Sequence, residues 1–151
     1  MAEYVGIDTE QLVAAGQNVL LIDSIPCPRG YVVHRNGSGI LTLRGCTSGN
    51  ACFARYEVSF GANIAVPEGG TAEAIAIALA INGEPLLNSR GIVTPAAVQQ
   101  YFNVHRTVTI TVPKGCCYTI AIENVDAGVD GLIDQQTISV ADASLTVVRT
   151  A

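Results

Sequence analysis

Apolar and polar side chains alternate along several stretches of this chain, and the alternation predicts β-strands. From Cys52 to Val66 the even positions are all apolar, whereas the odd positions are mostly polar. Successive strand residues point to opposite faces of a sheet, so this stretch should bury one face only. Its fifteen residues are long for one strand, and Gly61 is expected to mark a bulge or a bend between two sheets.

The region from Tyr101 to Asn124 shows the same period on both sides of a turn. Valine and isoleucine alternate with threonine up to Pro113, and apolar residues alternate again from Cys116. Proline cannot donate to a strand ladder, and Gly115 can adopt the backbone angles of a tight turn. A long antiparallel hairpin is predicted, with the other strands packed around it.

The segment 72–81 is apolar on both faces. Alanine occupies every even position, and isoleucine or leucine occupies the odd positions from Ile75. Alanine favours a helix, but the strict alternation and the following Asn82-Gly83 turn favour a strand. The alanine face should be covered closely, either by the second sheet or by a neighbouring subunit.

Turn residues recur about every 8–12 residues, and helical patterns are scarce, which is typical of an all-β sandwich or barrel. One short helix is predicted at 94–100, where Thr94 can cap it and Pro95 occupies its first position. Residues 1–17 lack a pattern and are expected to form an N-terminal arm, ahead of a single domain at 18–151. Further strands are expected at 18–24, 31–34, 40–44, 84–88, 135–140 and 143–149.

Hydrophobic residues make up 49% of the chain and charged residues only 14%. This balance favours an oligomer that hides apolar surface, over a large core alone. The net charge of −5 and the single lysine, Lys114, argue against a nucleic-acid partner. No apolar run is long enough for a membrane span, and the acidic start lacks the features of a secretory signal, so folding in the cytoplasm is expected.

The cysteine count is odd, which does not suggest a disulfide framework in such a chain. No Cys-x-x-Cys pair is present, and neither His34 nor His105 lies at ligand spacing from a cysteine, so zinc is not expected. The thiols are expected to be buried and to act as small apolar side chains. The five cysteines are Cys27, Cys46, Cys52, Cys116 and Cys117.

The sequence contains no recognisable catalytic or cofactor-binding motif. Ser38 lies in Asn-Gly-Ser-Gly, which differs from the nucleophile elbow of hydrolases, and no phosphate-binding loop is present. Neither an enzyme nor a cofactor is therefore expected. Asp126, Asp130 and Asp134, with Glu123 nearby, could hold calcium, but their spacing differs from an EF-hand loop. A solvated acidic loop is favoured, and no metal site is assigned.

Arg106 interrupts the apolar face of its predicted strand. An unpaired charge on such a face would be costly, so a carboxylate partner is expected, either Glu57 or Glu123. Together with His105, Arg106 could line a contact between subunits.

The phrases AIALAINGEPL and PKGCCYTIAIENV, with the final SLTVV strand, resemble in kind the central strands of the tumour-necrosis-factor-like jelly rolls, the fold of complement-type globular heads. Over roughly residues 18–150 the chain is also similar to small proteins encoded near capsid genes in tailed phages and prophages of Gram-positive gut bacteria. The Gly-X-Y stalk of collagen-linked members is missing. The resemblance implies an antiparallel jelly-roll β-sandwich that forms a compact homotrimer.

The resemblance also implies a non-enzymatic virion protein, such as a capsid decoration or head-fibre protein assembled in the bacterial host cytoplasm. Residues 1–17 would anchor the trimer to the major capsid protein or another virion protein. The alternative is a trimeric head that binds a receptor or a host surface glycan through loops 45–50 and 125–134. The resemblance suggests a trimer interface drawn from Phe53, Tyr56, Phe60, Ala74, Ala76, Ala78, Tyr101 and His105.

Overall fold

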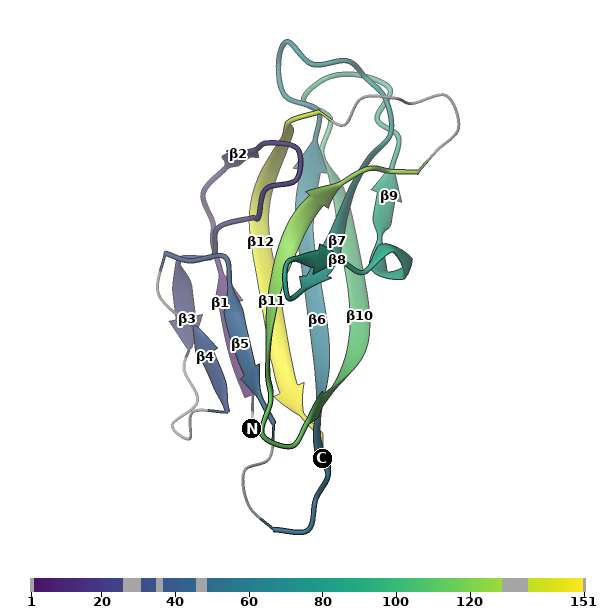
Figure 1. Ribbon diagram of the computed structural model, residues 1–151. Helices are drawn as coiled ribbons and strands as arrows, with labels where there is room; N and C mark the ends of the chain where they lie inside the picture. The colour runs from purple at the N-terminus through teal and green to yellow at the C-terminus, as the bar shows by residue number, and fades with distance from the viewer. Residues whose placement is uncertain (1, 26–30, 35–36, 46–48, 129–135, 151) are drawn as a thin grey trace.

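The computed structural model describes residues 2–25, 31–34, 37–45, 49–128 and 136–150, which form two facing six-stranded antiparallel sheets (Figure 1). Sheet A contains, in order, β10 (Phe102–Pro113), β6 (Phe53–Ala65), β12 (Ile138–Arg149), β1 (Ala2–Gly6) and β3 (Asp23–Ile25), with β2 (Gln11–Val13) also paired to β12. Sheet B contains β4 (Val32–His34), β5 (Leu41–Arg44), β11 (Cys117–Val125), β7 (Ile75–Ile81) and β8 (Glu84–Pro85), with β9 (Gly91–Val93) also paired to β7.

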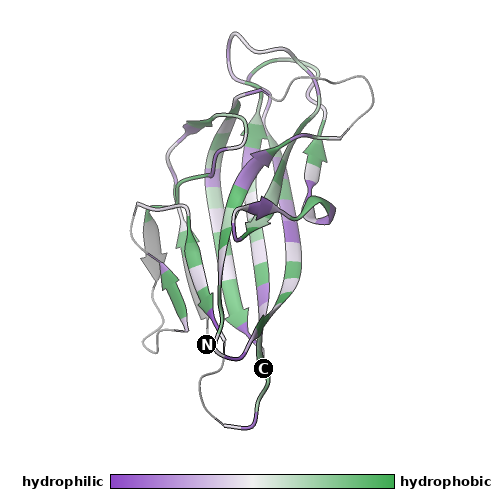
Figure 2. Ribbon diagram, viewed as in Figure 1, coloured by the Kyte–Doolittle hydropathy of each residue, from purple (hydrophilic) through white to green (hydrophobic). Residues whose placement is uncertain are grey.

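The predicted alternation of β6 is confirmed. Its even positions, from Ala54 to Ile64, are at most 1% exposed and face sheet B. Figure 2 shows the same alternation as bands of hydropathy along the long strands. The hydroxyl of Tyr56, in the middle of this row, donates a hydrogen bond to the backbone oxygen of Arg44 on sheet B. The core therefore lies between the two sheets, and β6 is its central strand.

Gly61 does not interrupt β6, which is continuous across this position. The irregularity lies instead in the neighbouring strand β12, whose register shifts between Ala141 and Ser144. A Cβ atom on Gly61 would lie 2.8 Å from the backbone oxygen of Val104 in β10. Close approach of β10 therefore explains this glycine, and the expected bulge at Gly61 is wrong.

The predicted hairpin of 101–124 is also wrong, although both of its strands exist. β10 pairs with β6 in sheet A, whereas β11 lies between β5 and β7 in sheet B. The turn is tight: the Cys116 amide donates to the Pro113 oxygen at 3.1 Å, and Gly115 has a φ of 77°. This turn carries the chain from one sheet to the other, a crossing that the chain also makes between β5 and β6 and between β6 and β7.

The expected N-terminal arm is part of the sandwich. β1 lies between β12 and β3, and β2 pairs with β12. The next residues cross to sheet B, where the Val19 amide donates to the Ile122 oxygen at 2.8 Å and the Asn124 amide donates to the Gln17 oxygen at 3.0 Å. Val5 and Val13 are buried. The prediction of a separate arm at 1–17 is therefore wrong, because this segment contributes strands and core residues to the fold.

The predicted helix at 94–100 is replaced by turns. The Ala96 amide donates to the side-chain oxygen of Gln100, and the Gln99 amide donates to the Val66 oxygen at 2.7 Å. These bonds replace the i to i−4 pattern of an α-helix. Within the described ranges, the single helical element is the 3-10 turn η1 (Leu87–Ser89).

β7 confirms the strand predicted within 72–81 and shows what covers its alanine face. Ile75, Ile77 and Leu79 enter the main core, whereas Ala76 and Ala78 form a second cluster with Val125 and Ala127. Val125 is the last residue of β11 and pairs with Ala76, and Ala127 follows it and packs against the alanine side chains. The cover therefore comes from the same chain, which answers the question that the sequence left open.

Candidate functional site

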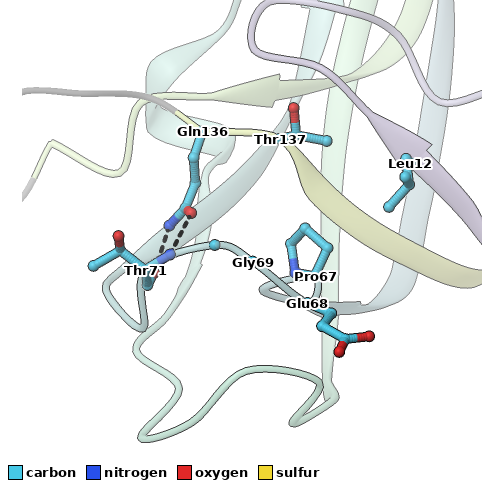
Figure 3. Close-up of a pocket in the computed structure, with 8 residues that line it drawn as sticks. Leu12, Pro67, Glu68, Gly69, Thr71, Gln136 and Thr137 are labelled. Carbon is cyan, nitrogen blue, oxygen red and sulfur yellow. Dashed lines mark hydrogen bonds between the residues drawn. The ribbon is translucent and has the colours of Figure 1, made fainter.

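A pocket of about 450 Å³ opens beside the connection between β6 and β7 (Figure 3). Residues 67–71 line one side, and Gln136 and Thr137, which precede β12, line another. Leu12 of β2 completes the lining, with 66% of its side chain exposed. The pocket is open to solvent and combines apolar groups with hydroxyl, amide and carboxylate groups.

Gln136 holds the pocket in shape. Its Nε2 donates to the Thr71 backbone oxygen at 2.8 Å, and its Oε1 accepts from the Thr71 amide at 3.2 Å. Gly70 packs beneath this pair, where a Cβ atom would lie 2.7 Å from Val66 and 2.9 Å from Gln136 Oε1. The Gln136 amide is therefore engaged by backbone, which leaves Thr137, Thr71 and the exposed Glu68 as polar groups for a ligand.

A hydrogen-bonded chain of side chains lies next to the pocket. Ser139 Oγ is 2.7 Å from the Tyr101 hydroxyl and donates to Glu10 Oε1 at 2.8 Å. Ser139 is 3% exposed and pairs with Leu12 of the pocket wall. Burial raises the pKa of Tyr101, and the Glu10 carboxylate raises it further, while the bond to Ser139 opposes this shift. These hydrogen bonds connect Glu10, which precedes β2, to Ser139 of β12 and to Tyr101, which precedes β10.

Neither histidine joins this network. His34 lies in β4 of sheet B, where its Nε2 is 2.8 Å from the Ser38 backbone oxygen. His105 lies in β10 of sheet A, exposed to solvent and opposite Gly61. The structure thus places the two histidines on different sheets and places Ser139 beside a tyrosine and a glutamate.

Four of the residues predicted for a trimer interface are buried within one chain. Tyr56 and Phe60 are on the inner face of β6, and Ala76 and Ala78 are covered by Ala127; all four are 0% exposed. They have no surface to offer to another subunit, so their assignment to an interface is wrong. The sequence pattern identified an apolar face correctly but could not show that the same chain covers it.

The other four predicted interface residues lie on two different sheets. Phe53, in β6, and Tyr101, which precedes β10, are 38% and 39% exposed, and His105 in β10 is also exposed. Ala74 is half-buried next to the alanine cluster of sheet B. Phe53 pairs with Pro113 at one end of β10, whereas Tyr101 precedes the other end, near His105. The structure therefore separates Phe53 from Tyr101 and His105, and it places Ala74 next to a different sheet.

Phe53, Tyr101 and His105 border a broad polar surface that we call the outer face of sheet A. Its central pair is Ser59 and Thr107, whose hydroxyl oxygens are 3.1 Å apart. Its side chains are mainly short and uncharged. The members from the three long strands are Arg55, Glu57, Ser59, Asn63, Asn103, Thr107, Thr109, Thr111, Ser144, Thr146 and Val148.

Among the residues that the structure describes, Arg106 pairs with no carboxylate, so the expected partners Glu57 and Glu123 are wrong. Its Nη1 donates to the Arg90 backbone oxygen at 3.2 Å, and its Nη2 donates to the Asn88 oxygen at 3.1 Å. β10 is an edge strand of sheet A, so the guanidinium can reach η1 and the start of β9 in sheet B. Arg106 therefore connects the two sheets.

The acidic stretch considered for calcium is only partly described, since Asp130 and Asp134 lie outside the described residues. Asp126 Oδ1 accepts a hydrogen bond from the Gly128 amide at 2.9 Å. In the described part of the chain, no three His, Cys, Asp or Glu side chains come together to hold a metal ion. No helix in the same part is long and apolar enough to cross a membrane.

The expectation of buried thiols is wrong for the three cysteines that the structure describes. Cys52, Cys116 and Cys117 are all exposed. Cys27 and Cys46 lie outside the described residues.

The globular domain of the zebrafish complement 1qA protein resembles this structure with a TM-score of 0.54 and 12% sequence identity. The match covers 97% of this chain and 94% of that domain. This chain has the complement-head jelly-roll fold. The prediction of an antiparallel jelly-roll sandwich is thereby confirmed.

Two sugar-binding domains match less well. The C-terminal domain of EclA, a sugar-binding protein, gives a TM-score of 0.35 at 10% identity, over 79% of this chain and 86% of that one. The CBM22-1 xylan-binding domain of Paenibacillus barcinonensis Xyn10C gives 0.37 at 12% identity, over 93% and 87%. Both scores are too low to establish a shared arrangement of strands. No family model and no curated protein matches the sequence.

Proposed function

We propose that this chain is a non-enzymatic structural protein of a phage particle, either a capsid decoration or a head-fibre protein, and that it functions as a homotrimer. The observation that carries the proposal is the outer face of sheet A. Thr107, Thr109 and Thr111 are exposed there on β10, the edge strand that lies next to the long strands β6 and β12. Short uncharged side chains lose less hydration free energy on burial than charged ones do, so this face suits a subunit interface.

The dimensions of the face support this role. β10, β6 and β12 contain 12, 13 and 12 residues. At about 3.3 Å per residue and about 4.8 Å between strands, they offer a surface of roughly 40 Å by 14 Å. That area, roughly 550 Å², is of the same order as the share that one partner contributes to a stable interface. Phe53 and Val148 add exposed apolar surface to it.

Attachment to a capsid would need a surface other than the N-terminal segment, because β1 and β2 are built into sheet A. Leu20, Ile22, Val33 and Ile40 are each 40–50% exposed. Gly39 touches the backbone of Val19, which brings the β4–β5 connection against the segment that carries Leu20 and Ile22. Exposed apolar side chains of this kind often mark a contact with another protein. In our proposal they contact the major capsid protein or another virion protein.

The solution mass of the purified chain tests the trimer. Light scattering after size exclusion should give three times 15.7 kDa at micromolar concentration. Thr107→Arg should reduce the mass to that of a monomer, since it places a charge opposite Ser59 in the centre of the face. Thr94→Arg, at an exposed position away from this face, is the matched control and should remain trimeric. A monomeric wild type, or a trimeric Thr107→Arg variant, would refute a trimer that forms through this face.

Co-sedimentation with phage heads that lack the protein tests the virion role. The wild-type trimer should sediment with the heads, whereas a variant with Leu20→Ser and Ile22→Ser should remain in the supernatant and keep its trimeric mass. Failure of the wild type to bind such heads would argue against a capsid decoration protein even if the trimer forms.

The pocket beside the β6–β7 connection favours a second candidate function, a head that recognises a glycan. Leu12 and Pro67 offer apolar surface, and the hydroxyl groups of Thr71 and Thr137 offer hydrogen bonds. A sugar ring needs this combination of an apolar platform and polar groups. The loops 45–50 and 125–134, which were first considered for this contact, lie partly outside the described residues.

A glycan array distinguishes the two candidates. A recognition head should bind a defined set of glycans, and Thr137→Arg should abolish that binding by filling the pocket. Wild-type protein that binds heads but no glycan would support the structural role alone.

A further inference from the structure

Three exposed cysteines lie at one end of the sandwich. Cys52 precedes β6, Cys116 is in the turn between β10 and β11, and Cys117 is the first residue of β11. Cysteine is among the residue types most often buried, so three exposed thiols on adjoining segments are unusual. An accessible thiol can exchange with disulfides, whereas a buried structural thiol is inert.

Backbone hydrogen bonds bring Cys52 and Cys116 to the same turn. The Lys114 amide donates to the Cys52 oxygen at 2.9 Å, which extends the ladder of β6 and β10 one step beyond the pair Phe53 and Pro113. The Cys116 amide donates to the Pro113 oxygen at 3.1 Å. Cys116 is thus the fourth residue of a β-turn, whose first and fourth Cα atoms lie within about 7 Å.

The alternation along β11 sets the direction of Cys117. Tyr118 packs against the core and pairs with the buried Leu43, so Cys117 points to the outer side of sheet B. Cys52 and Cys116 lie outside the strands, in a bend and in the turn, and both are exposed at the same end of the sandwich.

The connection between β5 and β6 is already held against this turn. The Gly45 amide donates to the Cys116 oxygen at 2.9 Å, and Lys114 Nζ donates to the Gly49 oxygen at 2.9 Å. A bond between Cys52 and Cys116 would therefore join segments that are in contact before oxidation. Disulfides form readily only where the backbone already brings the two cysteines close.

We propose that Cys52 and Cys116 are a redox-sensitive pair that closes to an intrachain disulfide between sheet A and sheet B, by exchange with a small-molecule disulfide. One protein thiolate attacks that disulfide, forms a mixed disulfide and expels one small thiolate. The second protein thiolate attacks the protein sulfur of the mixed disulfide and expels the other small thiolate. The two protein thiols lose two electrons and two protons, and the small disulfide is reduced to two thiols. Cys117 remains a thiol.

Incubating the folded chain with glutathione disulfide tests whether this disulfide forms. The intact mass should fall by that of two hydrogen atoms, and peptide mapping should place the new bond between Cys52 and Cys116. Closing this loop should raise the Tm by about 5–10 °C, and dithiothreitol should reverse the rise. Cys52→Ser and Cys116→Ser should each abolish both changes.

Cys117→Ser is the matched control, because it removes the neighbouring exposed thiol, which points to the outer side of sheet B. On oxidation, its mass should fall and its Tm should rise by the same amounts as in the wild type. An unchanged mass, stable glutathione adducts without closure, a bond to another cysteine, or a cross-link between two chains would each overturn the proposal.

Discussion

The outer faces of the two sheets follow the same rule of alternation and differ in what covers them. On β7 of sheet B, Ala76 and Ala78 are buried against Val125 and Ala127 of the same chain. On β10 of sheet A, Thr107 and Thr109 have no such cover and are exposed. An alanine row packs closely beneath a backbone segment, whereas a threonine row keeps its hydroxyl groups hydrated. The difference suggests that one face completes the monomer and the other is left for a second molecule.

Ala78→Asp should have the largest effect. The carboxylate would be buried beneath Ala127, where Ala78 is 0% exposed, and should cost about 4 kcal/mol or more. Thr109→Asp, on the other outer face, should change the stability of the monomer by about 0.5 kcal/mol or less. Urea unfolding measures both changes in the free energy of unfolding, at a protein concentration low enough for the subunits to be dissociated. Equal midpoints for the two variants would show that the faces do not differ.

Asn124→Ala should come next. Asn124 is 1% exposed, and its Nδ2 donates to the Val13 oxygen at 3.1 Å and to the Gln136 oxygen at 2.8 Å. It thereby links sheet B to the β2 segment of sheet A. The substitution removes the hydrogen bonds from Nδ2 to these two backbone oxygens. It should lower the free energy of unfolding by about 2–3 kcal/mol, with an unchanged urea m-value. Asn103→Ala, at an exposed position of sheet A, should cost far less.

Arg90→Ala should loosen the cover of the alanine face. Arg90 Nη1 donates to the Asp126 oxygen at 3.1 Å, and the guanidinium packs against Gly128. The loss should be about 1–2 kcal/mol. Hydrogen exchange should become faster in residues 125–128 and remain unchanged in β10. Arg55→Ala, which removes a cation stacked 5.1 Å from the Phe53 ring on sheet A, should leave both regions protected.

The pH dependence of stability should show the smallest effect. Burial raises the pKa of Glu123, which lies opposite Ala78, and the nearby Glu84 carboxylate raises it further. The folded state therefore holds this proton more tightly than the unfolded state. This contribution to stability is present at low pH and is lost as the pH rises from 4.5 through the raised pKa.

Glu123→Gln should flatten this part of the stability curve, measured by urea unfolding between pH 4 and pH 7. The same slope in wild type and Glu123→Gln would contradict the assignment.

Alternation predicted which residues face inward within a long strand, but it did not predict the partners of that strand. The inner row of β6 and the two apolar faces of β7 followed from period two alone. The pairing of β10 and β11 did not, because a tight turn such as Pro113–Cys116 can return within a sheet or cross to the opposite one. The strands β1 and β2 were missed because they have only five and three residues, too few for a period to emerge.

The candidate sites were less predictable than the fold. Tyr56 looked like an interface residue because a sequence shows an apolar side chain without showing what lies opposite. Cys52 and Cys116 looked like ordinary core thiols, since only the backbone places them at the end of the sandwich. The pocket depends on Gln136 bonding to Thr71, which is 65 residues away in the sequence.

The pairing of β1 with β12, from Ala2 opposite Val148 to Gly6 opposite Ser144, joins the first strand of the chain to the last. Both termini lie at the same end of the molecule (Figure 1). On a ribosome, β1 and its neighbour β3 emerge long before β12, the other partner of β1. Sheet A can therefore close only after β12 has left the exit tunnel, and until then the nascent chain carries an unpaired edge on β1.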